Sequence, residues 1–160
     1  MLPILVALVM GIIDFGFSFN DWISVRQGGR DGLRQVIVNT SPTPPGGSWT
    51  CNHGPFSAAS TDALAMDCFT KARVGLDDNK TAVSVYFSGT FTAGQPVKVC
   101  VQYETGSTTG FYNLILTNKI LSTEVESLIE QNSVTLSSFR ETTFIGDGRT
   151  VNWPTSCSTL

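Results

Sequence analysis

The chain opens on an apolar segment and then changes to a mixed pattern. Residues 1–19 contain 14 residues of the hydrophobic set and a single charge, Asp14. Helix-compatible sequence continues to Val38, where Asn, Ser, Thr, Pro and Gly take over. The pattern predicts one helix from Pro3 to Val38, about 54 Å long, whereas a bilayer core needs only about 30 Å. We therefore expect its second half to leave the membrane and pack on other structure.

The second half of this helix carries two patterned sets. Arg26, Arg30 and Arg34 are spaced i, i+4, i+8, so they share one face. Gly28 and Gly32 are spaced i, i+4, which allows close backbone approach. Because glycine costs about 1 kcal/mol inside a helix, these positions need a packing reason. A kink or helix end near Gly28 is the alternative.

Downstream, the periodicity predicts a small domain of mixed α+β structure. A short helix is expected over Asp62–Arg73, ended by Gly75. Alternating residues predict strands over 81–87 and 96–103, the strongest hairpin signal in the chain. The remaining expectations are a short helix over 111–118, a strand over 133–144 and an ambiguous helix or strand over 120–131.

Composition and charge exclude several classes of function. The 160 residues carry a net charge of −3 with a pI of about 5.0, so the chain lacks the basic character of nucleic-acid-binding proteins. Its 41% hydrophobic content is too high for a disordered chain. Only one segment is long enough to span a bilayer, which excludes a transporter or channel with several spans.

Four cysteines indicate two disulfides and an oxidising compartment outside the cytoplasm. Three pairings are possible, and we favour Cys51–Cys68 with Cys100–Cys157. The first would close a loop of about 16 residues and contribute about 3 kcal/mol in the chain-entropy model. The second would tie a central strand to the C-terminal tail. Four free thiols in a cytosolic protein are the alternative.

The apolar segment differs from a cleaved signal, because no Lys or Arg precedes it and no Ala-x-Ala site follows it. The aromatic residues near its end resemble an interfacial belt: Phe15, Phe17, Phe19 and Trp22. We interpret the segment as a retained anchor. The arginines after it would place the domain in the cytoplasm by the positive-inside rule, whereas the cysteines place it outside. A basic segment upstream of Met1 would resolve this conflict.

The residue patterns do not favour catalysis, a bound cofactor or a metal. His53 lies near Cys51 and Cys68 in sequence, but zinc sites show tighter paired spacings. The chain has no Gly-x-Ser-x-Gly motif that would pair with His53 in a hydrolase. Residues 28–32 lack the Lys-Ser/Thr of a phosphate loop, and residues 77–79 lack the full calcium-loop pattern.

Several motifs occur in a recognisable order along the first part of the chain. They are Leu2-Pro3-Ile4-Leu5, then Gly-Ile-Ile-Asp-Phe-Gly over 11–16, Asn20, and Arg-Gln-Gly-Gly-Arg-Asp-Gly-Leu-Arg over 26–34. Together they resemble the TadE-like family, the minor pilins or pseudopilins of tight-adherence (Tad/Flp) pili. Weaker similarity to the family's strands follows over 94–103 and 121–125.

Three departures from the family pattern stand out. Asp14 and Asp31 stand where the family has Glu, which keeps the charge. Gly28-Gly29 replaces an Ala pair, which keeps the small size. The basic stretch, prepilin cleavage region and acidic residue that precede Leu-Pro in the family do not precede it here, so we expect a truncated start.

The resemblance implies a pilin-like fold in which a long N-terminal helix packs on a small antiparallel β-sheet, and it favours a strand over 120–131. It implies a structural role in pilus assembly, without catalysis, and partners among other pilins, the membrane and the inner-membrane assembly platform. Asp14 would then set the helix register against a neighbour's amino terminus or arginine. Alternatively, Asp14 lies at the membrane surface, where a charge costs little.

We therefore expect an anchor over 1–22, its extracytoplasmic continuation over 23–40 and an extracytoplasmic α+β domain over 41–160, held at the bacterial inner membrane. The residues expected to serve helix packing or assembly are Gly11, Asp14, Gly16, Asn20, Arg26, Gly28, Arg30, Asp31, Gly32 and Arg34. An anchored extracellular binding module unrelated to pili is the alternative. Neighbouring genes for a secretion ATPase, two platform proteins and a prepilin peptidase would favour the pilin.

Overall fold

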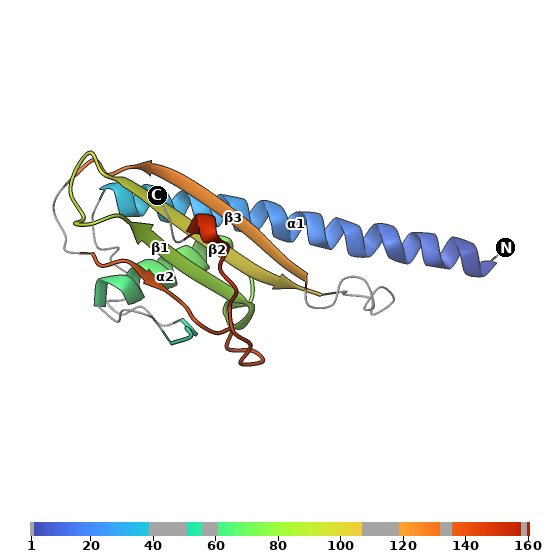
Figure 1. Cartoon of the computed structure of the whole chain (residues 1–160). Helices are drawn as coiled ribbons and strands as arrows, with labels where there is room; N and C mark the ends of the chain where they lie inside the picture. Colours follow the sequence, from blue (N-terminus) through green and yellow to red (C-terminus); the bar gives the residue numbers. More distant parts are fainter. Residues whose placement is uncertain (1, 39–50, 56–60, 107–118, 132–135, 158–159) are drawn as a thin grey trace.

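A computed structural model describes residues 2–38, 51–55, 61–106, 119–131, 136–157 and 160. The first element is a helix, α1 (Leu2–Val38), of 37 residues, which at 1.5 Å per residue is about 55 Å long. It runs without interruption through Gly28 and Gly29, so the predicted long helix is confirmed and the alternative of a helix end near Gly28 is wrong. Its N-terminal half extends well beyond the rest of the molecule (Figure 1).

The second helix and the sheet complete the framework. The helix α2 (Thr61–Val74) contacts α1 and is followed by a 3-10 turn, η1 (Asp78–Lys80). The strands are β1 (Thr81–Phe87), β2 (Pro96–Thr105), β3 (Lys119–Leu128) and β4 (Phe139–Arg140), and a short 3-10 helix, η2 (Thr155–Cys157), follows them. All pairings are antiparallel in the order β3-β2-β1-β4.

The sheet has two differently covered faces because successive residues of a strand point to opposite sides. Val83, Val85 and Val99 are among the valines that face the helices and form the main core with Val25 and Val36 of α1. On the other face the C-terminal segment lies across the strands, and the two sides are visible in Figure 1. The second half of α1 therefore belongs to the folded domain.

The outer face is joined to the C-terminal segment by polar and covalent contacts. Lys98 Nζ donates to the carbonyl of Ser156 at 2.7 Å, and Gln102 Nε2 donates to the carbonyl of Asn152 at 3.1 Å. A small second core of Ala82, Phe144 and Val151 lies beside them. The C-terminal segment thus forms a layer of its own on the sheet.

Two strand predictions are confirmed and one is mostly wrong. The hairpin of β1 and β2 lies where the alternation predicts it, and the ambiguous segment 120–131 forms β3. Of the described part of the strand expected over 133–144, which is 136–144, only Phe139–Arg140 is regular. The predicted helix over 111–118 lies outside the described residues.

Side chains explain why β4 is so short. The Glu141 carboxylate accepts from the Val83 amide at 2.9 Å, and the Ser138 hydroxyl accepts from the Phe87 amide at 3.3 Å. These side chains replace the main-chain carbonyls that would otherwise continue the ladder on either side of β4. The Thr142 amide turns away from β1 to the carbonyl of Pro55. A sequence pattern of alternating residues does not reveal such substitutions.

Candidate assembly interface and its supporting domain

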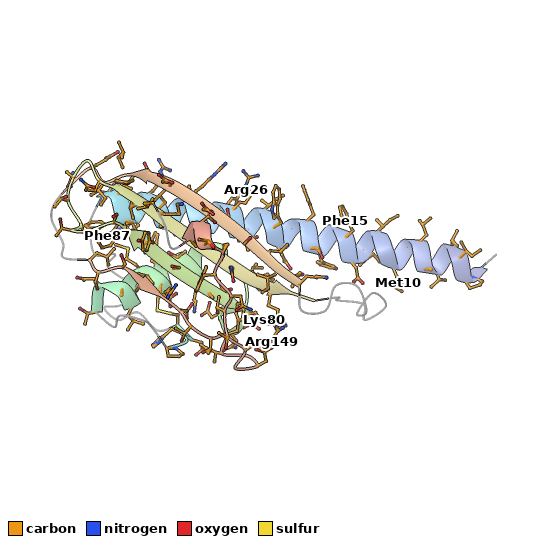
Figure 2. All side chains as sticks on the ribbon, in the orientation of Figure 1. Met10, Phe15, Arg26, Lys80, Phe87 and Arg149 are labelled. Carbon is orange, nitrogen blue, oxygen red and sulfur yellow. A yellow bond between two sulfur atoms is a disulfide. The ribbon has the colours of Figure 1, made fainter. Side chains whose placement is uncertain are left out.

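The N-terminal half of α1 exposes a continuous apolar surface. Figure 2 shows the side chains around Met10 and Phe15 standing clear of the domain. The large hydrophobic residues between 37% and 73% exposed on this half are Ile4, Leu5, Val6, Leu8, Val9, Ile12, Ile13, Phe15, Phe17, Phe19 and Ile23. Residues 4–23 span about 30 Å as a helix, which equals the thickness of a bilayer core. This surface can be covered by lipid or by other helices.

A hollow of about 550 Å³ lies on this exposed half, lined by Ile12, Ile13, Gly16, Phe17 and Asn20. A Cβ atom added at Gly16 would meet nothing within 4 Å. The described part of the chain therefore gives no internal reason for glycine at this position. Gly11 is half-buried and Asn20 is exposed.

Asp14 differs from its surroundings on the same helix. It is 2% exposed, although Ile13 is 40% and Phe15 is 73% exposed. Its carboxylate is thus shielded within the chain itself. Shielding lowers the cost of placing a charge among apolar residues, because the charge then does not face hydrocarbon directly.

The glycines of the second half of α1 have an internal reason. A Cβ at Gly28 would lie 2.8 Å from the Cα of Val74, and a Cβ at Gly32 would lie 2.6 Å from Oγ1 of Thr70. At Gly29 a Cβ would lie 2.8 Å from Cγ2 of Thr123 on β3. The close backbone approach predicted for Gly28 and Gly32 is therefore confirmed. It brings α1 against α2, and at Gly29 against the sheet, within the same chain.

Replacing Gly28 with leucine is expected to destabilise the domain by about 1–3 kcal/mol or more, because the backbone of Val74 would have to move. Urea unfolding of the full chain in detergent, followed by tryptophan fluorescence, measures the loss. The matched control is Gly16→Leu, which meets open space and should leave the stability unchanged or slightly higher. Equal effects of the two substitutions would contradict the close packing.

The three predicted arginines of α1 are all exposed. The guanidinium of Arg26 lies 4.7 Å from the ring centre of Trp22. Farther along α1, Arg34 and Asp31 line a hollow of about 300 Å³ together with Phe69 and Arg73 of α2. Arg73 itself lies over the ring of Phe69 at 5.1 Å. The structure thus adds a fourth arginine to the predicted set.

A buried charged cluster holds the domain together, and sequence reasoning missed it. Lys71 of α2 is 1% exposed, and its Nζ lies 2.8 Å from Oε1 of Glu141 and 3.5 Å from Oδ2 of Asp67. It also donates to the carbonyl of Asn52 at 2.9 Å, so its three N–H groups all have acceptors. Glu141 accepts in addition from the amides of Gly54 and Val83. The cluster joins α2, the 51–55 segment and β1.

A signal for this cluster was present in the sequence. Asp67 and Lys71 share one helical face with Ala63 and Val74, which are apolar and buried. Two opposite charges on the buried face of a short helix imply a partner inside the domain. The identity of that partner, Glu141, depends on a contact between residues 70 positions apart.

Asp67 is the member of the cluster whose negative charge is buried least favourably. Burial raises the pKa of its carboxyl well above the usual 3.8, the nearby Glu141 raises it further, and Lys71 opposes the shift. Its Oδ1 is buried without a hydrogen-bond partner. Because this pKa is higher in the folded state, the unfolded state loses the proton first as the pH rises. The favourable contribution of Asp67 to stability is therefore present below pH 3.8 and is lost as the pH rises through the folded-state pKa.

Asp67→Asn is therefore expected to flatten the pH dependence of stability. The wild-type chain should lose stability relative to the variant as the pH is raised from about 4 to about 8, since only the wild type must bury a charged carboxylate. Chemical unfolding of both proteins across this range measures the difference. A wild-type chain that instead gains stability relative to the variant as the pH rises would reverse the sign and refute this description of Asp67.

Both disulfides have the predicted pairing. Cys51–Cys68 joins the 51–55 segment to α2, and Cys100–Cys157 joins β2 to the C-terminal segment. Each pair lies beside a carboxylate, Asp67 in one case and Glu124 in the other, but sulfurs bonded to each other are not thiolate ligands. His53 is exposed, and its Nδ1 lies 3.2 Å from the carbonyl oxygen of Gly54.

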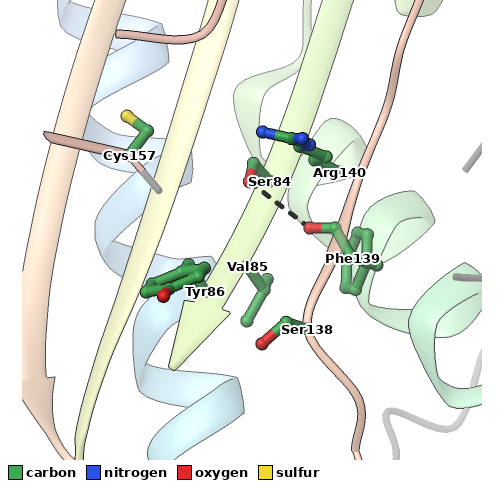
Figure 3. Close-up of a pocket in the computed structure, with 7 residues that line it drawn as sticks. All are labelled: Ser84, Val85, Tyr86, Ser138, Phe139, Arg140 and Cys157. Atoms are coloured by element: carbon green, nitrogen blue, oxygen red, sulfur yellow. Dashed lines mark hydrogen bonds between the residues drawn. The ribbon is translucent and has the colours of Figure 1, made fainter. Parts of the chain in front are cut away.

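A hollow of about 310 Å³ lies on the outer face of the sheet, between β1 and β4 (Figure 3). Its polar groups come from Ser84, Tyr86 and Arg140, and Cys157 closes one side. The Ser84 hydroxyl is already used, because it donates to the carbonyl of Phe139 at 3.3 Å. The hollow has mixed polarity and lies on the face of the sheet opposite the main core.

The comparisons with known proteins agree with the resemblance noted in the sequence. No curated protein and no solved structure matches the chain. The family model described as TadE-like protein matches residues 1–34. The matched segment contains the exposed half of α1 together with its arginines and glycines. The N-terminal part of this chain is therefore similar to TadE-like proteins, as its motifs predict.

Proposed function

We propose that the chain is a membrane-anchored, pilin-like structural subunit that takes part in assembly of a bacterial tight-adherence pilus. The observation that carries this proposal is the exposed apolar half of α1, in the same segment that matches the TadE-like family. The helix is long and apolar enough to cross a membrane, and its apolar part is almost entirely unburied by the rest of the chain.

The remainder of the chain supports an outward-facing domain. Two disulfides are typical of proteins that fold outside the cytoplasm. Residues 1–22 would form the anchor at the inner membrane, residues 23–40 the start of the extracytoplasmic part, and residues 41–160 the domain. Gly16 and Gly11 would pack against α1 helices of other pilins, because the described part of the chain leaves Gly16 uncovered.

The role is structural in this proposal, with no catalysed reaction. Its partners are other pilins or pseudopilins, the assembly platform and the membrane. Charged residues of the domain are used in contacts that hold it together, as in the Lys71 cluster and the bonds of Lys98. Charged side chains that are fixed in buried pairs stabilise the domain, as a structural role requires.

Piliation tests this proposal. A strain of the encoding bacterium that lacks the gene should show few or no tight-adherence pili by electron microscopy, and the full-length gene should restore them. The matched control is a gene for residues 21–160 behind an unrelated cleaved export signal, which should restore nothing. Normal piliation in the deletion strain would contradict the proposal.

An extracellular binding module is a second candidate. The hollow of about 310 Å³ lined by Tyr86 and Arg140 favours it, since mixed aromatic and cationic groups suit a small polar ligand. The neighbouring genes distinguish the two candidates: a secretion ATPase, platform proteins and a prepilin peptidase belong with a pilus. Adhesion lost while piliation stays normal would favour the binding module.

A further inference from the structure

We infer that Arg30, Arg34 and Arg73 form a docking surface for carboxylate side chains of a second copy of this chain. We call these three residues the arginine face. The inference deepens the proposed function and rests on it for the position of the membrane. The proposed contact lies outside the apolar half of α1.

The arginine face has the geometry of a binding surface. Arg30 and Arg34 are one turn apart on α1, and Arg73 comes from the adjoining α2. Arg34 and Arg73 line the same hollow of about 300 Å³. Within the described part of the chain, the ion pairs of Lys71, Lys98 and Arg149 do not involve the arginine face. The planar guanidinium groups are therefore available for two-pronged bonds to carboxylates.

Distance along α1 separates this surface from lipid headgroups. If the membrane boundary lies at Trp22, a rise of 1.5 Å per residue places Arg26 about 6 Å above it, Arg30 about 12 Å and Arg34 about 18 Å. The headgroup layer of one leaflet is only about 5–8 Å thick. Arg26, packed on Trp22, is thus at the height of lipid phosphates. Arg34 is beyond them, so its anionic partner is a protein.

The charge distribution favours a second copy as that protein. The three arginines together with Asp31 carry a net charge of +2, and the whole chain carries −3, so the rest of the chain carries −5. Exposed carboxylates are found elsewhere on the domain, for example at Asp77 and Glu130. A basic patch on an otherwise acidic molecule suits a heterologous contact, in which one copy's patch meets a different surface of the next. Such contacts propagate along a fibre.

A zero-length cross-link tests the contact without any pilus. Arginine does not couple to carboxylates through a carbodiimide, but lysine does, so Arg30→Lys/Arg34→Lys keeps the charge and makes the surface reactive. Equal amounts of isotope-labelled and unlabelled full chain in neutral detergent should give mixed cross-linked peptides from position 30 or 34 to a carboxylate of the other copy. The exposed Lys80 and Lys119 are the internal controls and should give fewer.

A second measurement uses charge removal. The full chain should self-associate in sedimentation velocity at low salt and less at about 1 M salt, where screening acts beyond about 3 Å. Arg34→Gln/Arg73→Gln should abolish the salt-sensitive part, whereas the matched Lys80→Gln/Lys119→Gln should keep it. A monomer at every salt concentration, or equal association of both variants, overturns the inference. So does a loss confined to binding of phosphatidylglycerol vesicles, which would assign the surface to the membrane. None of these readouts depends on pilus assembly.

Discussion

Lys71→Met is expected to lower the free energy of unfolding by about 3–5 kcal/mol, because it leaves Glu141 buried at 1% exposure without its counter-ion. The methionine fills a similar volume, so the loss reflects charge and hydrogen bonding rather than a cavity. The carbonyl of Asn52 would also lose its donor, which loosens the link between α2 and the 51–55 segment.

Urea unfolding of the full chain in detergent gives this difference. The matched control is Lys80→Met, at an exposed position on η1, which should change the stability by less than about 0.5 kcal/mol. A double variant, Lys71→Met/Glu141→Leu, should recover part of the loss, since it removes both charges together. A Lys71→Met protein as stable as the control would show that the cluster does not hold the domain.

Removing the Cys100–Cys157 disulfide, as Cys100→Ser/Cys157→Ser, is expected to cost about 4 kcal/mol in the chain-entropy model. The bond joins residues 57 positions apart and fixes the C-terminal layer to the middle of the sheet. The shorter Cys51–Cys68 link spans 17 positions and should cost about 3 kcal/mol when removed. The longer loop should therefore give the larger loss.

Hydrogen exchange distinguishes a local loosening from a global one. Without Cys100–Cys157, we expect faster exchange in residues 142–157 and smaller changes in the helices, because only the hydrogen bonds of Lys98 and Gln102 and the small second core then join the layer to the sheet. The double serine variant of Cys51 and Cys68 serves as the comparison and should loosen the other side of the domain. Identical exchange patterns in the two variants would contradict the separate layers described above.

The elements set by local pattern were predictable from the sequence. Alternation in β1 follows directly from a strand with one face on the helices and the other on the C-terminal layer, and α1 follows from its length and lack of breakers. Segment 120–131 was ambiguous because its residues favour helix while its side chains alternate. Pairing of β3 with β2 along ten residues decides it, and that contact is not local.

The candidate interface was predictable only in part. The arginines and the apolar surface of α1 follow from spacing, but the addition of Arg73 depends on how α2 docks, as the close approach of Gly28 to Val74 shows. The shortness of β4 depends on single side chains, Glu141 and Ser138, that take over main-chain hydrogen bonds. Long-range polar contacts of this kind leave no periodic trace in a sequence.

In the proposed topology, the apolar half of α1 anchors the chain while the disulfide-bonded domain lies outside the inner membrane. Lys80 and Lys119 are exposed on the domain. Labelling spheroplasts of the encoding bacterium with a membrane-impermeant, amine-reactive reagent therefore tests this topology. We expect both lysines to be labelled in intact spheroplasts while a cytoplasmic marker is not. Labelling of these lysines only after the membrane is permeabilised would place the domain in the cytoplasm and rule out this topology.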